Sequence, residues 1–164
     1  HDPRVADTLA GYLEHADEEI RTEAAFGLAE LEDPRAAAVL VAVARTGVGR
    51  ADDAFGALRS ACRACETWRM AGDEMAPQIQ DGDLMFVDRA ADQLVGNGIY
   101  ALELGGRFMV RRVESRMGAG LVFKCEKPGY VDCVVKDAAA ARRMGLRVIG
   151  KVRGAVGVVR FWRQ

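Results

Sequence analysis

Apolar residues recur at helical spacing in the first third of the chain. Leu28 stands three or four residues from each of Ala24, Ala25 and Leu31, which places the four on one face of a helix. Asp17 precedes the run, and the acidic residues after it suit the positive end of a helix dipole. The pattern predicts a helix that begins after Asp17.

The same third contains a repeat. Residues 2–9 (DPRVADTL) match residues 33–40 (DPRAAAVL) at an offset of 31 residues. Asp before Pro marks a helix start, because Asp caps free N–H groups and Pro is favoured at the first helical position. Alternating helices with this period and Ala-rich interfaces resemble HEAT-like repeats, and a plain helical bundle is the alternative. The chain begins inside a repeat, so we expect either further N-terminal sequence or a short array that caps itself on a second domain.

Two glycines interrupt the helical runs. Gly27 and Gly56 each lower helix propensity by up to about 1 kcal/mol relative to Ala. The sequence contains neither a Gly-x-Gly-x-x-Gly nor a Walker motif. We therefore interpret both glycines as sites of close helix packing.

Beyond residues 46–50 (TGVGR), whose glycines break the helical pattern, the apolar period shifts towards two. Short apolar runs alternate with glycine-rich turns, and Gly105-Gly106 reads as a hairpin turn. We expect strands at 84–87, 98–104, 107–113, 121–125, 148–152 and 156–161. The sequence thus predicts an α+β protein, with a helical repeat segment at 1–61 and a curled antiparallel β-domain at 62–164.

Composition narrows the classes of function. The chain has 164 residues, 50% of them hydrophobic, and a formal net charge of -1. A net charge this close to zero gives no overall electrostatic attraction to nucleic acid. The C-terminal part is locally basic, starting with Arg142, Arg143 and Arg147. The apolar stretches are far shorter than the roughly 20 residues that span a bilayer. We expect no membrane association, no cofactor and a cytoplasmic location.

The four cysteines carry an open alternative. Cys62 and Cys65 form a Cys-x-x-Cys pair, and Cys125 and Cys133 follow much later. A four-thiolate zinc site is one interpretation. The irregular spacing favours buried free thiols in a reducing compartment. We expect no metal role for His1 or His15.

Two segments carry a family resemblance. Residues 72–77 read GDEMAP, and residues 81–88 read DGDLMFVD. They resemble the signature of the LexA-like, S24-type domain of phage repressors, in which Gly-Asp-Ser-Met-x-Pro precedes Asp-Gly-Asp and an apolar strand. Gly72, Asp73, Met75 and Pro77 match the loop around the nucleophile, and Asp83 matches the turn behind it. Further matches follow in order at 98–100, 109–113, 127–130 and 148–152.

The resemblance assigns a Ser–Lys dyad to positions that here hold Glu74 and Arg111. A carboxylate is not activated by a neighbouring amine as a hydroxyl is. Arginine stays protonated at ordinary pH, so Arg111 is no general base. The two opposite charges predict an ion pair. The other candidate nucleophiles, Ser60 and Ser115, lack a Gly-Asp-Ser-Met context.

These features predict a pseudo-peptidase rather than an enzyme. Residues 39–70 contain no Ala-Gly or Cys-Gly pair, the bond that LexA-like regulators cut in themselves. We expect a non-catalytic dimerisation or sensing module of a phage-repressor-like transcription regulator, as a homodimer through the β-domain. The apolar Phe161-Trp162 pair either covers the sheet edge or pairs with a second copy. A protein or peptide is a possible partner, and DNA only through missing sequence or the basic patch. The alternatives are a HEAT-repeat adaptor with a pseudo-peptidase domain and an active S24-type peptidase.

Overall fold

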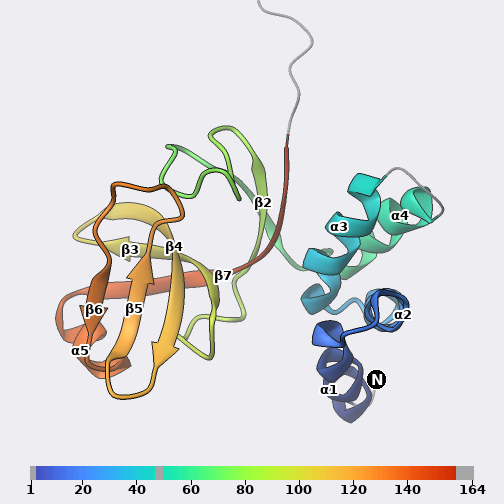
Figure 1. Cartoon of the computed structure of the whole chain (residues 1–164), viewed down its shortest axis with the longest axis horizontal. Coiled ribbons are helices and arrows are strands. Elements are labelled where there is room, and N and C mark those ends of the chain that lie inside the picture. The colour runs from blue at the N-terminus through green and yellow to red at the C-terminus, as the bar shows by residue number, and fades with distance from the viewer. Residues whose placement is uncertain (1–2, 47–49, 158–164) are drawn as a thin grey trace, which may run out of the picture. The chain divides into compact units, whose positions relative to one another are not determined.

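A computed structural model describes residues 3–46 and 50–157, in which helices precede a sheet (Figure 1). The chain divides into two compact units. The first runs to Glu66 and includes Arg153–Ala155, and the second begins at Thr67. The helices are α1 (Pro3–Gly11), α2 (Glu18–Glu30), α3 (Ala37–Thr46), α4 (Ala51–Ala61) and α5 (Ala138–Arg143), with 3₁₀ turns at Tyr12–Glu14 and Pro34–Ala36.

The predicted helix starts are confirmed at two places. The Asp17 side chain accepts a hydrogen bond from the Glu19 N–H at the start of α2. Asp33 accepts one from the Arg35 N–H, and Pro34 takes the first position of the turn that leads into α3. The third predicted start, at Asp2, lies outside the described residues, as do Gly47–Gly49. Ala24, Ala25 and Leu28 are buried as their spacing predicts.

The two helical glycines differ. A Cβ on Gly27 would lie 3.2 Å from Leu9 Cδ1, so this glycine does permit close packing of α1 on α2. A Cβ on Gly56 would meet nothing within 4 Å. The packing interpretation of Gly56 is therefore wrong, because that side of α4 faces open space.

The second unit is built on a seven-stranded sheet of order β1-β2-β7-β3-β4-β5-β6. The strands are β1 (Glu66–Arg69), β2 (Leu84–Asp88), β3 (Gly98–Leu104), β4 (Arg107–Arg116), β5 (Gly120–Lys124), β6 (Cys133–Val135) and β7 (Leu146–Val156). Strand β3 pairs antiparallel with both β4 and β7, and β5 pairs antiparallel with both β4 and β6. The helix-then-sheet α+β layout agrees with the sequence prediction.

One strand prediction is wrong in detail. The segments 148–152 and 156–161 were expected as separate strands, but β7 runs without interruption from Leu146 to Val156. Gly150 explains how β7 passes close to β2, since a Cβ there would lie 2.6 Å from the Asp88 carbonyl oxygen. Residues 158–161 and the Phe161-Trp162 pair lie outside the described residues.

One buried apolar cluster of the second unit is formed by β3, β4, β5 and α5. Tyr100, Leu102, Val113 and Phe123 are buried together, and Ala141 of α5 packs against them. The Tyr100 hydroxyl donates to the Val95 carbonyl at 2.6 Å, so its polar end is satisfied. The antiparallel pairing brings β3, β4 and β5 side by side, with α5 drawn near β6 (Figure 1).

Among residues 3–46 and 50–157, no helix is long and apolar enough to cross a membrane.

Candidate functional site

The loop at residues 72–77 is a tight turn fixed by its own backbone. Gly72 has φ of +100°, a conformation that L side chains rarely adopt. Its N–H donates to Asp81 Oδ1 at 2.9 Å, which ties the loop to the Asp-Gly-Asp turn. Met75 is fully buried, and its carbonyl accepts from the Ile79 N–H at 2.9 Å. The peptide bond before Pro77 is cis. The loop thus holds residue 74 in a defined place.

Glu74 and Arg111 form the predicted ion pair. Arg111 Nη1 lies 3.2 Å from Glu74 Oε1, although 36 residues separate the two along the chain. Both side chains are about four-fifths covered, at 18% exposure for Glu74 and 21% for Arg111. Nη1 also donates to the Val110 carbonyl at 2.6 Å. A single nitrogen therefore makes both contacts, rather than the bidentate fork that arginine can present.

Asp73 ties the same loop to the segment after β5. Its carboxylate accepts from the Lys127 ammonium and from the Tyr130 hydroxyl, the latter at 3.1 Å. The Glu74 carbonyl accepts from the N–H groups of Glu126 and Lys127 at 2.9 and 3.1 Å. These contacts fix residues 73–74 against residues 126–130.

Asp73, Lys127 and Tyr130 together are called the Asp73 clamp, and the pKa of each of these three residues is shifted. Hydrogen bonds from Lys127 and then Tyr130 lower the pKa of Asp73 below its usual range. The hydrogen bond to Asp73 raises the pKa of Lys127 and of Tyr130. A lysine with a raised pKa stays protonated, so Lys127 is suited to binding and not to proton abstraction.

Asp83 locks the turn behind the loop. It is the buried charged side chain of the described residues, at 9% exposure. Its Oδ2 accepts from the Gln80 N–H at 2.9 Å, and its carbonyl accepts from the Met70 N–H at 2.8 Å. The Gly82 N–H donates to the Met70 carbonyl at 2.9 Å. Asp83 therefore has a structural role beside the pair, without contacting it.

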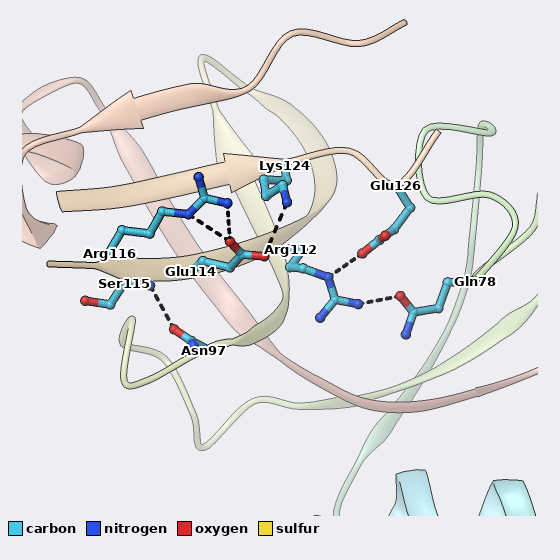
Figure 2. Close-up of polar contacts among 8 residues, drawn as sticks. All are labelled: Gln78, Asn97, Arg112, Glu114, Ser115, Arg116, Lys124 and Glu126. Atoms are coloured by element: carbon cyan, nitrogen blue, oxygen red, sulfur yellow. Dashed lines mark hydrogen bonds and ion pairs between the residues drawn. The ribbon is translucent and has the colours of Figure 1, made fainter. Parts of the chain in front are cut away.

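Arg112 points to a different set of partners from its neighbour Arg111. Figure 2 shows Arg112 between Glu126 and Gln78, with Nε donating to Glu126 and Nη2 to Gln78. Further along β4, Glu114 accepts from Arg116 and Lys124 (Figure 2). These ion pairs lie along β4 and β5 and satisfy their charges locally.

A cavity of about 240 Å³ adjoins Arg111. Its walls include Met109, Phe123, Val135 and Ala141, so most of the lining is apolar. Arg111 is the charged residue of the lining, which also includes Cys125 and Cys133. Burial raises the pKa of the Cys125 thiol, while nearby Arg111 lowers it to a smaller extent.

The remaining candidate residues lie elsewhere. Ser60 belongs to α4. Ser115 lies in β4, and its backbone N–H donates to Asn97 Oδ1 at 2.8 Å (Figure 2). None of the four cysteines forms a disulfide. The described part of the chain has no group of three or more His, Cys, Asp or Glu side chains able to hold a metal ion.

The family model for Peptidase S24-like proteins matches residues 54–153. The chain belongs to the Peptidase S24-like family. No curated protein matches the chain. The matched segment contains the loop at 72–77, the turn at Asp83 and the strand that carries Arg111.

Within this S24-like domain the structure brings together some of the predicted site residues and separates others. Gly72, Asp73, Glu74 and Met75 lie in one loop, and Arg111 reaches it from β4. Pro77 is the last residue of the same loop, and Asp83 lies in the turn that follows it. The sequence interpretation missed Lys127 and Tyr130 as partners of Asp73, although it noted the segment 127–130 as a family match.

Proposed function

We propose that the S24-like domain is a non-catalytic module, the dimerisation or sensing part of a phage-repressor-like transcription regulator. The observation that carries the proposal is the contact between Glu74 and Arg111 at 3.2 Å. The family resemblance assigns the nucleophile and the base to these two positions. Neither residue type can perform the assigned step, because arginine keeps its proton and so accepts none, and a carboxylate has no hydroxyl for a base to deprotonate.

The rest of the loop supports a scaffold retained without its chemistry. Asp73, Met75 and Asp83 hold the loop through a salt bridge, core packing and a turn hydrogen bond. A loop fixed in this way presents its backbone and side chains for binding. We propose that a protein or peptide segment, or a second copy of the chain, is what the domain binds.

The helical unit carries a further part of the proposal. Its paired helices, with Asp-capped starts and alanines at the interface, support an interpretation as HEAT-like repeats. A HEAT-like adaptor that carries a pseudo-peptidase domain is the second candidate function. Val5, Tyr12 and Phe55 are large apolar side chains that this unit exposes, and this second candidate requires a protein partner that covers them.

Two measurements test the proposal on the full chain. Mass spectrometry after incubation at pH 7 to 10, alone and with a mixed peptide library, should find the chain and the peptides intact. Products that disappear in Glu74→Gln would establish a peptidase and overturn the proposal. Sedimentation velocity should show a dimer, and a monomer at every concentration would remove the dimerisation role.

A further inference from the structure

The cavity beside Arg111 combines an apolar lining with one cation. Residues from β3 to β7 and from α5 form its walls, and Met109, Phe123 and Leu146 supply apolar surface. Its volume of about 240 Å³ falls below the roughly 300–1,000 Å³ of pockets for drug-sized ligands. The size therefore suits a compact organic molecule rather than a nucleotide or a lipid.

Arg111 keeps donors available to such a molecule. Its contacts to Glu74 and to the Val110 carbonyl both use Nη1. Among the described residues, no buried side-chain nitrogen lacks a hydrogen-bond partner. Nε and Nη2, for which the described chain supplies no acceptor, are therefore open to solvent. These two nitrogens form the planar fork that matches the two oxygens of a carboxylate.

The other charges near the cavity leave this fork usable. Glu74 occupies the Nη1 side of the guanidinium, and Asp132 is an exposed residue whose charge solvent screens. Among the charged groups that act on the Cys125 thiol, Arg111 has the largest effect, ahead of Glu74 and Asp132. An arginine can bind two carboxylates at once through different nitrogens, because it carries five N–H donors.

We propose that this cavity binds a compact monocarboxylate with an apolar body. The carboxylate takes Nε and Nη2 of Arg111, and the apolar body lies against Met109, Phe123 and Leu146. The inference rests on the proposed function in one respect, that Arg111 serves as a binding group and not as a base. It goes further by giving the sensing role a chemical class of ligand.

Cys125 offers a direct probe, because its thiol lines the cavity. The full-length protein is treated with iodoacetamide in the presence of 4-methylpentanoate or benzoate, and each cysteine is followed by peptide mass mapping. The acids should slow alkylation of Cys125 several-fold and saturably. Cys65, which is half-buried in the helical unit, should react at an unchanged rate and serves as the internal control. The matching amides, 4-methylpentanamide and benzamide, should protect Cys125 at least about tenfold less well, since they lack the charge that strengthens the contact with Arg111.

A pair of neighbouring arginines provides the matched variants. Arg111→Gln should abolish protection by the acids, whereas Arg112→Gln should preserve it, because Arg112 bonds to Glu126 and Gln78 and does not line the cavity. Circular dichroism checks that both variants fold, and if Arg111→Gln does not, the comparison of acid with amide in the wild type decides. Saturation-transfer NMR of the acids repeats the test without a thiol.

The outcomes separate this inference from the proposed function. Absence of protection by both acids, or equal protection by acids and amides, would overturn the monocarboxylate site and leave the non-catalytic role standing. Peptide hydrolysis by the wild type would overturn the non-catalytic role, and acid-specific protection of Cys125 would still establish the binding site.

Discussion

The α-carbon of Gly72 lies against the carboxylate of Glu74, two residues further along the same loop. A Cβ on Gly72 would overlap Glu74 Oε2, and the φ of Gly72 is +100°. Space and backbone conformation therefore both require glycine at position 72 while Glu74 keeps its place beside Arg111.

Gly72→Ala should destabilise the second unit, which contains the sheet, by more than the strain of the backbone alone. That strain is about 1–2 kcal/mol. Gly82→Ala is the matched control, because Gly82 has φ of +89° and a Cβ there meets nothing within 4 Å. Urea unfolding followed by Trp68 fluorescence, in a Trp162→Phe background, reports the difference. Gly72→Ala with Glu74→Ala should approach the control, and equal losses in the two single variants would contradict the Glu74 contact.

The Asp73 clamp should make the free energy of unfolding of the second unit depend on pH. The pKa of Asp73 is lowered, so its contribution is present above about pH 4, the unfolded value, and is lost as pH falls through the folded value. The pKa values of Lys127 and Tyr130 are raised, so their contribution is complete below about pH 10 and is lost as pH rises through their folded values.

Asp73→Asn should therefore differ most from the wild type between about pH 5 and 9. The free energies of unfolding of the two proteins should converge in acid. Urea titrations at several pH values measure the difference. A difference that stays constant from pH 2 to pH 7 would show that the Asp73 charge does not hold the clamp.

Asp83→Ala should cost about 1–3 kcal/mol of unfolding free energy, since it leaves the Gln80 N–H without its acceptor in a buried turn. Asp83→Asn should cost less, because the amide oxygen can accept the same hydrogen bond. The same fluorescence assay ranks the two variants. An Asn variant as unstable as the Ala variant would indicate that the charge, rather than the hydrogen bond, matters.

Cys125 should react more slowly than Cys133 with iodoacetamide at pH 8. Burial raises the pKa of the Cys125 thiol and so reduces its thiolate, which is the reactive form. Cys133 is exposed. Peptide mass mapping over time gives both rates, and the rate at Cys125 should still be rising at pH 9. Equal rates at pH 8 would place Cys125 in a more open environment than the cavity wall.

The sequence allowed the contact between Glu74 and Arg111 to be predicted because two opposite charges replaced two cooperating residues of a family pattern. Strands β3 and β4 were also predictable, since Gly105-Gly106 separates two alternating apolar runs. In such cases the signal is local in the sequence or is carried by a motif.

Other features left no such signal. Strands β1 and β6 have four and three residues, too few to show a period of two. Helix α5 has six residues, all alanine or arginine, and so no apolar stripe marks its buried face at Ala141. The Asp73 clamp joins residues more than 50 positions apart, and only the folded sheet brings Lys127 and Tyr130 to it.

We expect the acid Glu74 and the cation Arg111 to stabilise each other at the two positions where the family resemblance assigns a nucleophile and a base. A double-mutant cycle with Glu74→Gln, Arg111→Gln and the double variant measures this mutual stabilisation as a coupling free energy, in urea with Trp68 as the probe. We expect a favourable coupling of about 1–2 kcal/mol, as for residues in one ion pair. Effects of the two substitutions that add to within about 0.3–0.5 kcal/mol would contradict it.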